Sequence, residues 1–216
     1  MEIDKVKKIV FLTGTRADFG KIKSVISFLQ NDSSFEVHIF VTGMHMKAAY
    51  GSTVCEIEKF GVSNIYKFIN YSGISELDTI FANTISGFGN YIRELKPDMI
   101  VVHGDRSEAL AGAIVGAFNN ILVAHIEGGE VSGTVDEVVR HTISKIAHLH
   151  FVANDEAKRR IIQMGEKEEA VFGIGSPELD LMTSDKLPSI TETKKIFDIP
   201  FEEYGILIVH PVTTEI

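Results

Sequence analysis

Short apolar runs alternate with longer amphipathic stretches along most of this sequence. Six of the runs are rich in β-branched residues and apolar on both faces, which is typical of parallel strands covered on each side. They span residues 9–13, 37–42, 99–103, 121–126, 149–153 and 171–174. Between them, apolar residues recur at helical spacing over residues 21–29, 46–60, 75–95, 107–119, 135–147 and 156–164. The pattern predicts an α/β fold with a doubly wound, Rossmann-like parallel sheet.

Two polar patterns predict where helices begin. Ser75 with Asp78 precedes one helical stretch, and Thr134 with Glu137 has the spacing of a capping box before another.

The pattern changes after residue 174. Residues 176–200 lose strand character and contain one predicted helix at 190–197. The apolar run at residues 204–209 then predicts a seventh strand, which ends at His210. We therefore expect a Rossmann-like domain over residues 1–182. Residues 183–216 would be a linker and the truncated start of a second βα domain.

Composition and charge exclude several classes of protein. An apolar fraction of 44% and a single cysteine among 216 residues exclude a disordered chain and a disulfide scaffold. A net charge of −9 argues against a nucleic-acid partner, because phosphate backbones bind clustered cations. Cys55 alone cannot form an intrachain disulfide, and no apolar run approaches the length of a membrane span. We expect a cytoplasmic protein with no membrane partner.

Glycines and charged residues follow five of the predicted strands. They occupy residues 13–18, 42–45, 103–106, 125–130 and 173–178. In open α/β sheets, ligands bind outside the carboxyl ends of the strands, so one site is predicted there. The first stretch is a glycine-containing turn that leads into a helix, which places Arg16 to meet an anion. It fails the P-loop pattern, and no dinucleotide fingerprint occurs.

Three carboxylates in this region are candidates for chemistry. Asp105 and Glu127 directly follow apolar strands, where an ionised carboxylate is costly unless it is paired or used. Bonds to the adjacent glycine-rich loops are the alternative interpretation for both. Asp136 lies in the first turn of the predicted helix at 135–147, and an ion pair with Arg140, four residues on, is its alternative.

Several histidines raise the question of a metal site, which the sequence does not favour. The stretch after Gly104-Asp105 supplies no second aspartate, and an arginine follows directly. We predict no metal, and we interpret His103, His125 and His150 as histidines at the edge of the core.

Five motifs together resemble the hydrolysing UDP-N-acetylglucosamine 2-epimerases of sialic acid biosynthesis. They are GTRADFGK, VTGMH, HGDR, HIEGGEVSGTVDE followed by RH, and HPVTTE, in the family's order over residues 8–216. HIEGGEVSGT is specific to the sialic acid branch. The resemblance implies a GT-B-like fold of two Rossmann-like domains with the active site between them, and this chain would cover the first domain and the opening strand of the second.

The resemblance also implies a reaction and its residues. UDP-N-acetylglucosamine and water would give N-acetylmannosamine and UDP by elimination and re-addition at C1 and C2, without a cofactor. The family's catalytic residues match Asp105, Glu127, Asp136 and His210. Glu127 and Asp136 would be the acid/base pair, Asp105 would shape their charge, and His210 would reach the leaving phosphate. The implied substrate-binding residues are Arg16, Asp18, His45, Arg106, His125 and Arg140.

Three alternatives stay open at this point. The sugar could be UDP-2,4-diacetamido-2,4,6-trideoxyglucose, as in legionaminic acid pathways, because selection at C4 and C6 depends on few contacts. The chain could belong to a GT-B glycosyltransferase, or to a nucleotide-sugar-binding domain without turnover. Because the family's uridine and diphosphate contacts lie largely after position 216, we expect little activity from this chain alone. The full-length protein is expected to be a homodimer.

Overall fold

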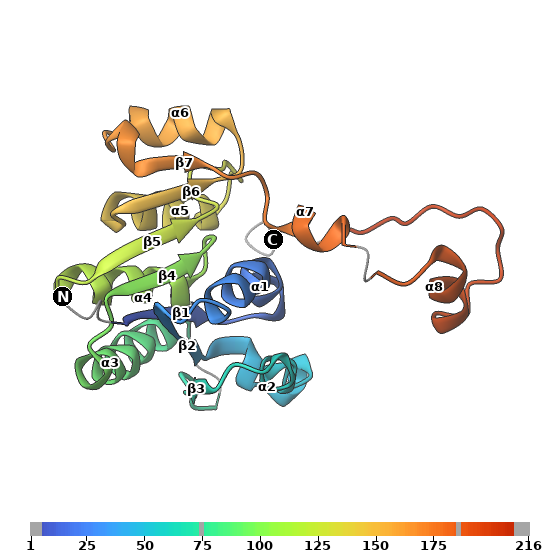
Figure 1. Cartoon of the computed structure of the whole chain (residues 1–216), viewed down its shortest axis with the longest axis horizontal. Helices are drawn as coiled ribbons and strands as arrows, with labels where there is room; N and C mark the ends of the chain where they lie inside the picture. The colour runs from blue at the N-terminus through green and yellow to red at the C-terminus, as the bar shows by residue number, and fades with distance from the viewer. Residues whose placement is uncertain (1–5, 74–75, 185–186, 210–216) are drawn as a thin grey trace. The chain divides into compact units, whose positions relative to one another are not determined.

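Seven parallel strands form one sheet in the part of the chain that the computed structural model describes, residues 6–73, 76–184 and 187–209. The strand order is β3-β2-β1-β4-β5-β6-β7, as Figure 1 shows. The strands are β1 (Lys7–Thr13), β2 (Phe35–Val41), β3 (Asn64–Lys67), β4 (Met99–His103), β5 (Leu122–Ile126), β6 (Leu149–Val152) and β7 (Val171–Gly173). Strand order reverses direction between β1 and β4, so the carboxyl ends of these two strands flank the switch point.

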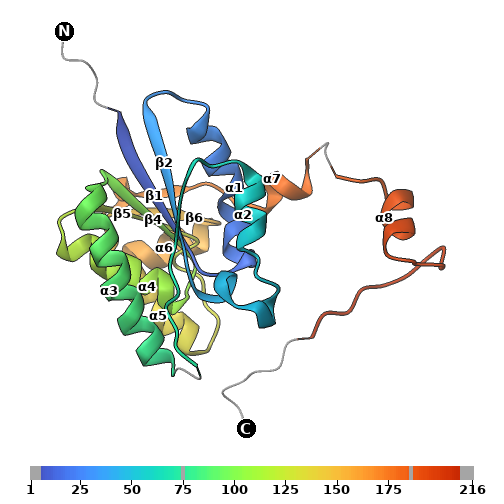
Figure 2. The ribbon, with the colours of Figure 1, turned by 90° about the horizontal axis from the view of Figure 1, so that it is seen from below.

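Helices cover both faces of the sheet (Figure 2). On one face, α1 (Arg16–Gln30) and α2 (Val54–Phe60) bury Phe19 and Ile57 against Phe11 of β1. On the other face lie α3 (Leu77–Leu95), α4 (Ser107–Phe118) and α5 (Val135–Ile146), with Phe88 and Ile143 in the core. The helix α6 (Asp155–Gln163) packs on β6 and β7. The predicted doubly wound α/β class is confirmed.

The strand predictions are confirmed for six strands and wrong for a seventh. The run at 204–209 forms no strand among the described residues, and its last four side chains are 72–88% exposed. A strand needs a partner for its backbone groups, and the apolar run has none within the described part of the chain. The edge strand β3 was missed, because its sequence NIYK has no continuous apolar run and it forms by pairing with β2.

Three helix predictions need correction. The stretch 46–60 is not one helix: two 3-10 turns, Gly43–Met46 and Ala48–Tyr50, precede α2, and the chain turns through Gly51 with φ +81°. The helix α1 begins at Arg16 rather than residue 21, because Thr15 and Asp18 form a capping box. At α5, Glu137 accepts hydrogen bonds from the N–H groups of Ser132 and Gly133, so Thr134 caps that helix without the expected box. Ser75 lies outside the described residues.

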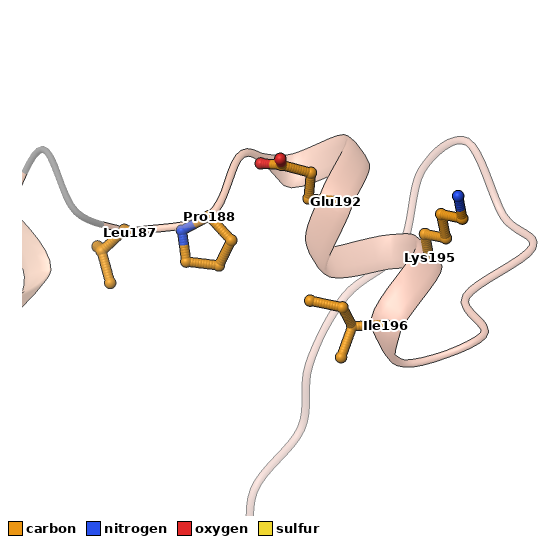
Figure 3. Close-up of a pocket in the computed structure, with 5 residues that line it drawn as sticks. All are labelled: Leu187, Pro188, Glu192, Lys195 and Ile196. Carbon is orange, nitrogen blue, oxygen red and sulfur yellow. The ribbon is translucent and has the colours of Figure 1, made fainter.

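The chain divides into two compact units, Met1–Glu178 and Leu179–Ile216. The short helix α7 (Glu178–Met182) begins at this division. In the second unit, α8 (Ile190–Ile196) begins with a capping box between Ser189 and Glu192. Beside it is an open hollow of about 480 Å³ (Figure 3), whose wall is made by Leu187, Pro188, Glu192, Lys195 and Ile196. The interpretation of residues 183–216 as the start of a second domain stays a prediction.

Candidate active site

Three elements bring charged side chains together at the carboxyl end of the sheet. Glu127 directly follows β5, His103 is the last residue of β4, and Lys21 lies on α1. Side chains alternate between the two faces of a strand, and Val101 packs on the α1 side of the sheet. His103, two residues later, therefore points to the same side as Lys21.

Glu127 is the centre of this group. Its Oε2 accepts hydrogen bonds from Lys21 Nζ at 2.8 Å and from His103 Nε2 at 2.9 Å. Its Oε1 accepts one from the hydroxyl of Ser176 at 3.2 Å. The Glu127 side chain is 13% exposed, so the carboxylate is largely withdrawn from solvent and is held by protein donors.

These contacts decide the charge of Glu127. Burial by itself raises the pKa of this carboxyl, but the hydrogen bonds from His103 and Lys21 outweigh it and lower the pKa to about 2. For Lys21, burial lowers the pKa of the amine, and the nearby Glu127 and Glu178 carboxylates more than reverse that and raise it. Glu127 is therefore an ionised carboxylate at neutral pH, which is the form that can accept a proton.

The backbone at Glu127 is in a sparsely populated conformation. Its φ is +58°, in the left-handed region that favours glycine. Gly129, two residues later, has φ +79°. The N–H of Glu127 donates to the carbonyl of Phe151 at 2.8 Å, which ties the turn to β6. Such a conformation costs about 1–2 kcal/mol in a non-glycine residue, and strain of this kind gathers at functional sites.

Asp105 is paired with Arg140, an arrangement that differs from the sequence interpretation. An Arg140 guanidinium N–H donates to Asp105 Oδ2, and the Arg140 side chain is only 15% exposed. The alternative interpretation of Asp136, an i,i+4 ion pair with Arg140, is therefore wrong. Asp136 is exposed, and its carboxylate accepts a hydrogen bond from the hydroxyl of Thr134 at 3.1 Å. The structure brings Asp105 and Arg140 together, but among the described residues it shows no contact of Asp136 with Glu127 or Asp105.

His125 supports the turn that carries Asp105. Its Nε2 lies 2.7 Å from the Gly104 carbonyl and its Nδ1 3.2 Å from Ser144 Oγ. Because a carbonyl only accepts, Nε2 carries the proton and Nδ1 is the acceptor. The ring is fully buried, and burial lowers its pKa to about 3, so it is neutral. The expected substrate contact of His125 stays a prediction, since both ring nitrogens bond within the protein.

The β5–α5 turn leaves no room for a side chain at Gly128. A Cβ there would lie 2.8 Å from His125 Nδ1 and 2.9 Å from Ser144 Oγ. We expect Gly128→Ala to lower the free energy of unfolding by about 1–3 kcal/mol, as overpacking does, measured by urea denaturation. Gly173→Ala is the matched control, because nothing lies within 4 Å of its added Cβ. Equal stability of the two variants would contradict this packing.

The β1–α1 turn is braced from within. Both oxygens of the buried Asp18 accept backbone N–H groups, from Gly14 at 3.0 Å and Thr15 at 3.1 Å. The ring of the buried His45 lies 3.1 Å from Thr13 Oγ1 and 2.7 Å from Thr53 Oγ1. Asp18 and His45 therefore shape this turn, and their expected contacts with substrate stay predictions.

Two of the expected substrate-binding arginines are accessible to a ligand. The Arg16 side chain is 74% exposed, with its Nε 3.1 Å from Glu56 Oε1. Arg106 is partly exposed, with its Nε 3.4 Å from Glu108 Oε2. An exposed guanidinium beside a helix N-terminus can bind a phosphate, so Arg16 keeps its expected role as a prediction.

His210 lies outside the described residues. Sequence reasoning missed Lys21, interpreted His103 as a core-edge histidine, and gave Ser176 no role. One signal was available for Lys21: it ends the motif GTRADFGK and flanks the buried stripe of α1 formed by Asp18, Phe19, Ile22 and Ile26.

Some features do not occur in the part of the chain that the structure describes. No three His, Cys, Asp or Glu side chains there lie close enough together to hold a metal ion. No helix there is both long and apolar enough to cross a membrane. Cys55 is exposed on α2 and has a free thiol.

Together, the doubly wound sheet and a partly buried, ionised carboxylate beside its switch point define an α/β protein with a polar site at the carboxyl edge of its sheet. Residues 27–216 match the profile of the UDP-N-acetylglucosamine 2-epimerase family. The chain belongs to this family.

Individual relatives agree with that assignment. The chain is 49% identical to a UDP-N-acetylglucosamine 2-epimerase of Neisseria meningitidis, over 97% of the chain and 56% of the relative. It is 40% identical to a hydrolysing UDP-N,N'-diacetylbacillosamine 2-epimerase of Legionella pneumophila, over 98% of the chain and 57% of the relative. The chain thus spans little more than half the length of these relatives.

Solved structures show the same fold. The UDP-GlcNAc 2-epimerase of Methanocaldococcus jannaschii, in complex with UDP-GlcNAc and UDP, superposes with a TM-score of 0.74 at 25% identity. The match covers 88% of this chain and 53% of that one. A UDP-GlcNAc 2-epimerase from Neisseria meningitidis bound to UDP-GlcNAc gives a TM-score of 0.75 at 22% identity, over 90% and 53% of the two chains.

Proposed function

We propose that the full-length protein is a hydrolysing UDP-N-acetylglucosamine 2-epimerase that supplies N-acetylmannosamine for sialic acid synthesis. The observation that carries this proposal is the partly buried Glu127 carboxylate, held ionised by Lys21 and His103 beside the switch point of a chain of this family. The names of some relatives support the finer function. One of them is a polysialic acid biosynthesis protein of Escherichia coli, at 33% identity.

The proposed reaction needs one base and one acid on opposite faces of the sugar. Glu127 takes the proton from C2 as the C1–O bond to UDP breaks, which leaves a C1=C2 double bond. Water then adds across this double bond: its hydroxyl bonds to C1, and its proton passes through Asp136, the proposed acid, to C2 on the other face. The proton held by Glu127 is released to solvent as UDP leaves. The sum is UDP-N-acetylglucosamine plus water giving N-acetylmannosamine plus UDP, with no redox change and no cofactor.

The cations of the site would stabilise the leaving group. Arg16 is the proposed contact of the diphosphate, and His210 the proposed partner of the leaving phosphate. Asp105, paired with Arg140, would shape the charge around the sugar, and Asp18, His45, Arg106 and His125 would line or brace the cleft. We propose a homodimer in the cytoplasm, with the UDP-sugar as ligand and without nucleic-acid or membrane partners.

An assay of two proteins tests the function. One protein is this 216-residue chain. The other, which we call the extended protein, is this chain together with the residues that its coding sequence encodes after Ile216. We expect the extended protein to release UDP and N-acetylmannosamine from UDP-N-acetylglucosamine, and the chain alone to be far slower. Equal rates would contradict the dependence on later residues.

The same assay decides between the sugars and between the reaction types. A higher kcat/KM with the UDP-2,4-diacetamido sugar would move the proposal to the legionaminic acid substrate, which the Legionella pneumophila relative makes the second candidate. UDP release only when an acceptor is added would indicate a glycosyltransferase and overturn the epimerase.

A further inference from the structure

The chain that leaves β7 touches the ionic centre at two points. Ser176 donates its hydroxyl to Glu127 Oε1 at 3.2 Å. Two residues later, Glu178 Oε1 lies 3.5 Å from Lys21 Nζ. We call residues 176–178 the exit segment. Its two polar side chains thus reach both partners of the Glu127–Lys21 ion pair.

We infer that the exit segment is a positioning element of the site, which orients the Glu127 carboxylate through Ser176 and shares the Lys21 ammonium through Glu178. This inference rests on the proposed function only for its consequence in catalysis. The contacts themselves are independent of it.

The two oxygens of Glu127 are held unequally. Oε2 accepts two charge-assisted bonds, from Lys21 and His103, at 2.8 and 2.9 Å. Oε1 accepts one bond from a neutral hydroxyl at 3.2 Å, which is longer than the usual 2.7–2.8 Å for such a pair. Oε1 is therefore the oxygen with spare capacity to take a proton, and among the described residues the Ser176 hydroxyl is the donor that contacts it.

Lys21 is divided between two carboxylates. Its side chain is 23% exposed, that of Glu127 is 13% and that of Glu178 is 47%. Glu178 is the more solvated partner, so it can leave Lys21 at lower desolvation cost than Glu127 can. When Glu178 departs, the ammonium stays with Glu127 alone.

The exit segment ends at Glu178, the last residue of the first compact unit. The contacts of Ser176 and Glu178 with the Glu127–Lys21 ion pair therefore lie at the carboxyl end of that unit.

NMR on the 216-residue chain tests the inference without any turnover. We would follow the Glu127 Cδ and Lys21 Nζ signals, assigned with Glu127→Gln and Lys21→Arg, in Ser176→Ala, Glu178→Gln and the double variant. We expect each single variant to shift both signals, because the two contacts meet in one ion pair. The double variant should depart from the sum of the single shifts.

A matched control distinguishes the specific effect of Glu178 on these signals from a general effect of removing one negative charge. Glu168 Oε1 lies 3.5 Å from Lys158 Nζ, the same separation as in the Glu178–Lys21 pair. Glu168→Gln should leave the Glu127 and Lys21 signals unchanged, and Glu178→Asp should restore part of the Lys21 shift. If Ser176→Ala or Glu178→Gln leaves either signal where it is in the wild type, with the amide spectrum intact, the inference is overturned. If the proposed epimerase function were wrong, the expected NMR shifts would stay the same, because they are measured without turnover.

Discussion

Glu127→Gln is expected to lower kcat of the extended protein by about 100- to 10,000-fold, the usual contribution of a positioned acid or base. The amide keeps the shape of the carboxylate, so Lys21 and His103 retain an acceptor, but it cannot take a proton from C2. KM should change much less than kcat, because the loss falls on a step after binding. Initial rates of UDP release over a range of substrate concentrations measure both quantities.

Glu94→Gln is the control for this variant. Glu94 is an exposed residue near the end of α3, whose carboxyl end leads into the start of β4 and so lies at the sheet edge opposite the site. The Glu94→Gln variant of the extended protein should release UDP at the wild-type rate. A Glu127→Gln protein that folds and keeps kcat within a few-fold would remove Glu127 from the chemistry.

Stability is expected to fall steeply as the pH drops below neutrality, with His125 as one of the main causes. The pKa of this ring is about 3 in the folded protein, against an ordinary value of 6.5. Between these values the unfolded chain binds a proton that the folded chain does not, so the free energy of unfolding decreases as pH falls. From pH 7 to pH 5 the loss is about 2 kcal/mol for this residue. Urea denaturation at pH 7 and pH 5 measures it.

The pH range over which stability is lost distinguishes the contribution of the histidines from that of Glu127. The stabilisation from Glu127 is lost only as pH falls from about 4.5 to about 2, because its folded pKa is lowered. Burial also lowers the pKa of His45 and His150, so they add to the same loss. His125→Gln should be less stable at pH 7 yet lose about 2 kcal/mol less on going to pH 5. An equal slope in the wild type and in His125→Gln would contradict the assignment.

The layers of the fold could be predicted from periodicity alone, because strands covered on both faces read as continuous apolar runs. The exception is instructive. The run at 204–209 has the composition of a buried strand, but composition does not supply a neighbour, and the described structure gives it none. The edge strand β3 shows the converse, since pairing with β2 alone makes NIYK a strand.

The location of the site could be predicted, whereas its pairings could not. Glu127 and Asp105 follow neighbouring parallel strands, so their placement at the same edge of the sheet follows from topology. The contact of Lys21 with Glu127 joins residues 106 positions apart, and that of Arg140 with Asp105 joins residues 35 apart. Local spacing favoured Arg140 with Asp136, and only the packing of α5 beside the β4–α4 turn reverses that choice.

Reaction in D₂O tests the central claim, that Glu127 and an opposing acid exchange the hydrogen on C2, most directly. The extended protein would be given UDP-N-acetylglucosamine in D₂O, and the released sugar would be analysed by NMR and mass spectrometry. The account predicts N-acetylmannosamine with one deuterium at C2, formed in step with UDP. Release of N-acetylglucosamine with its original hydrogen at C2 would contradict it.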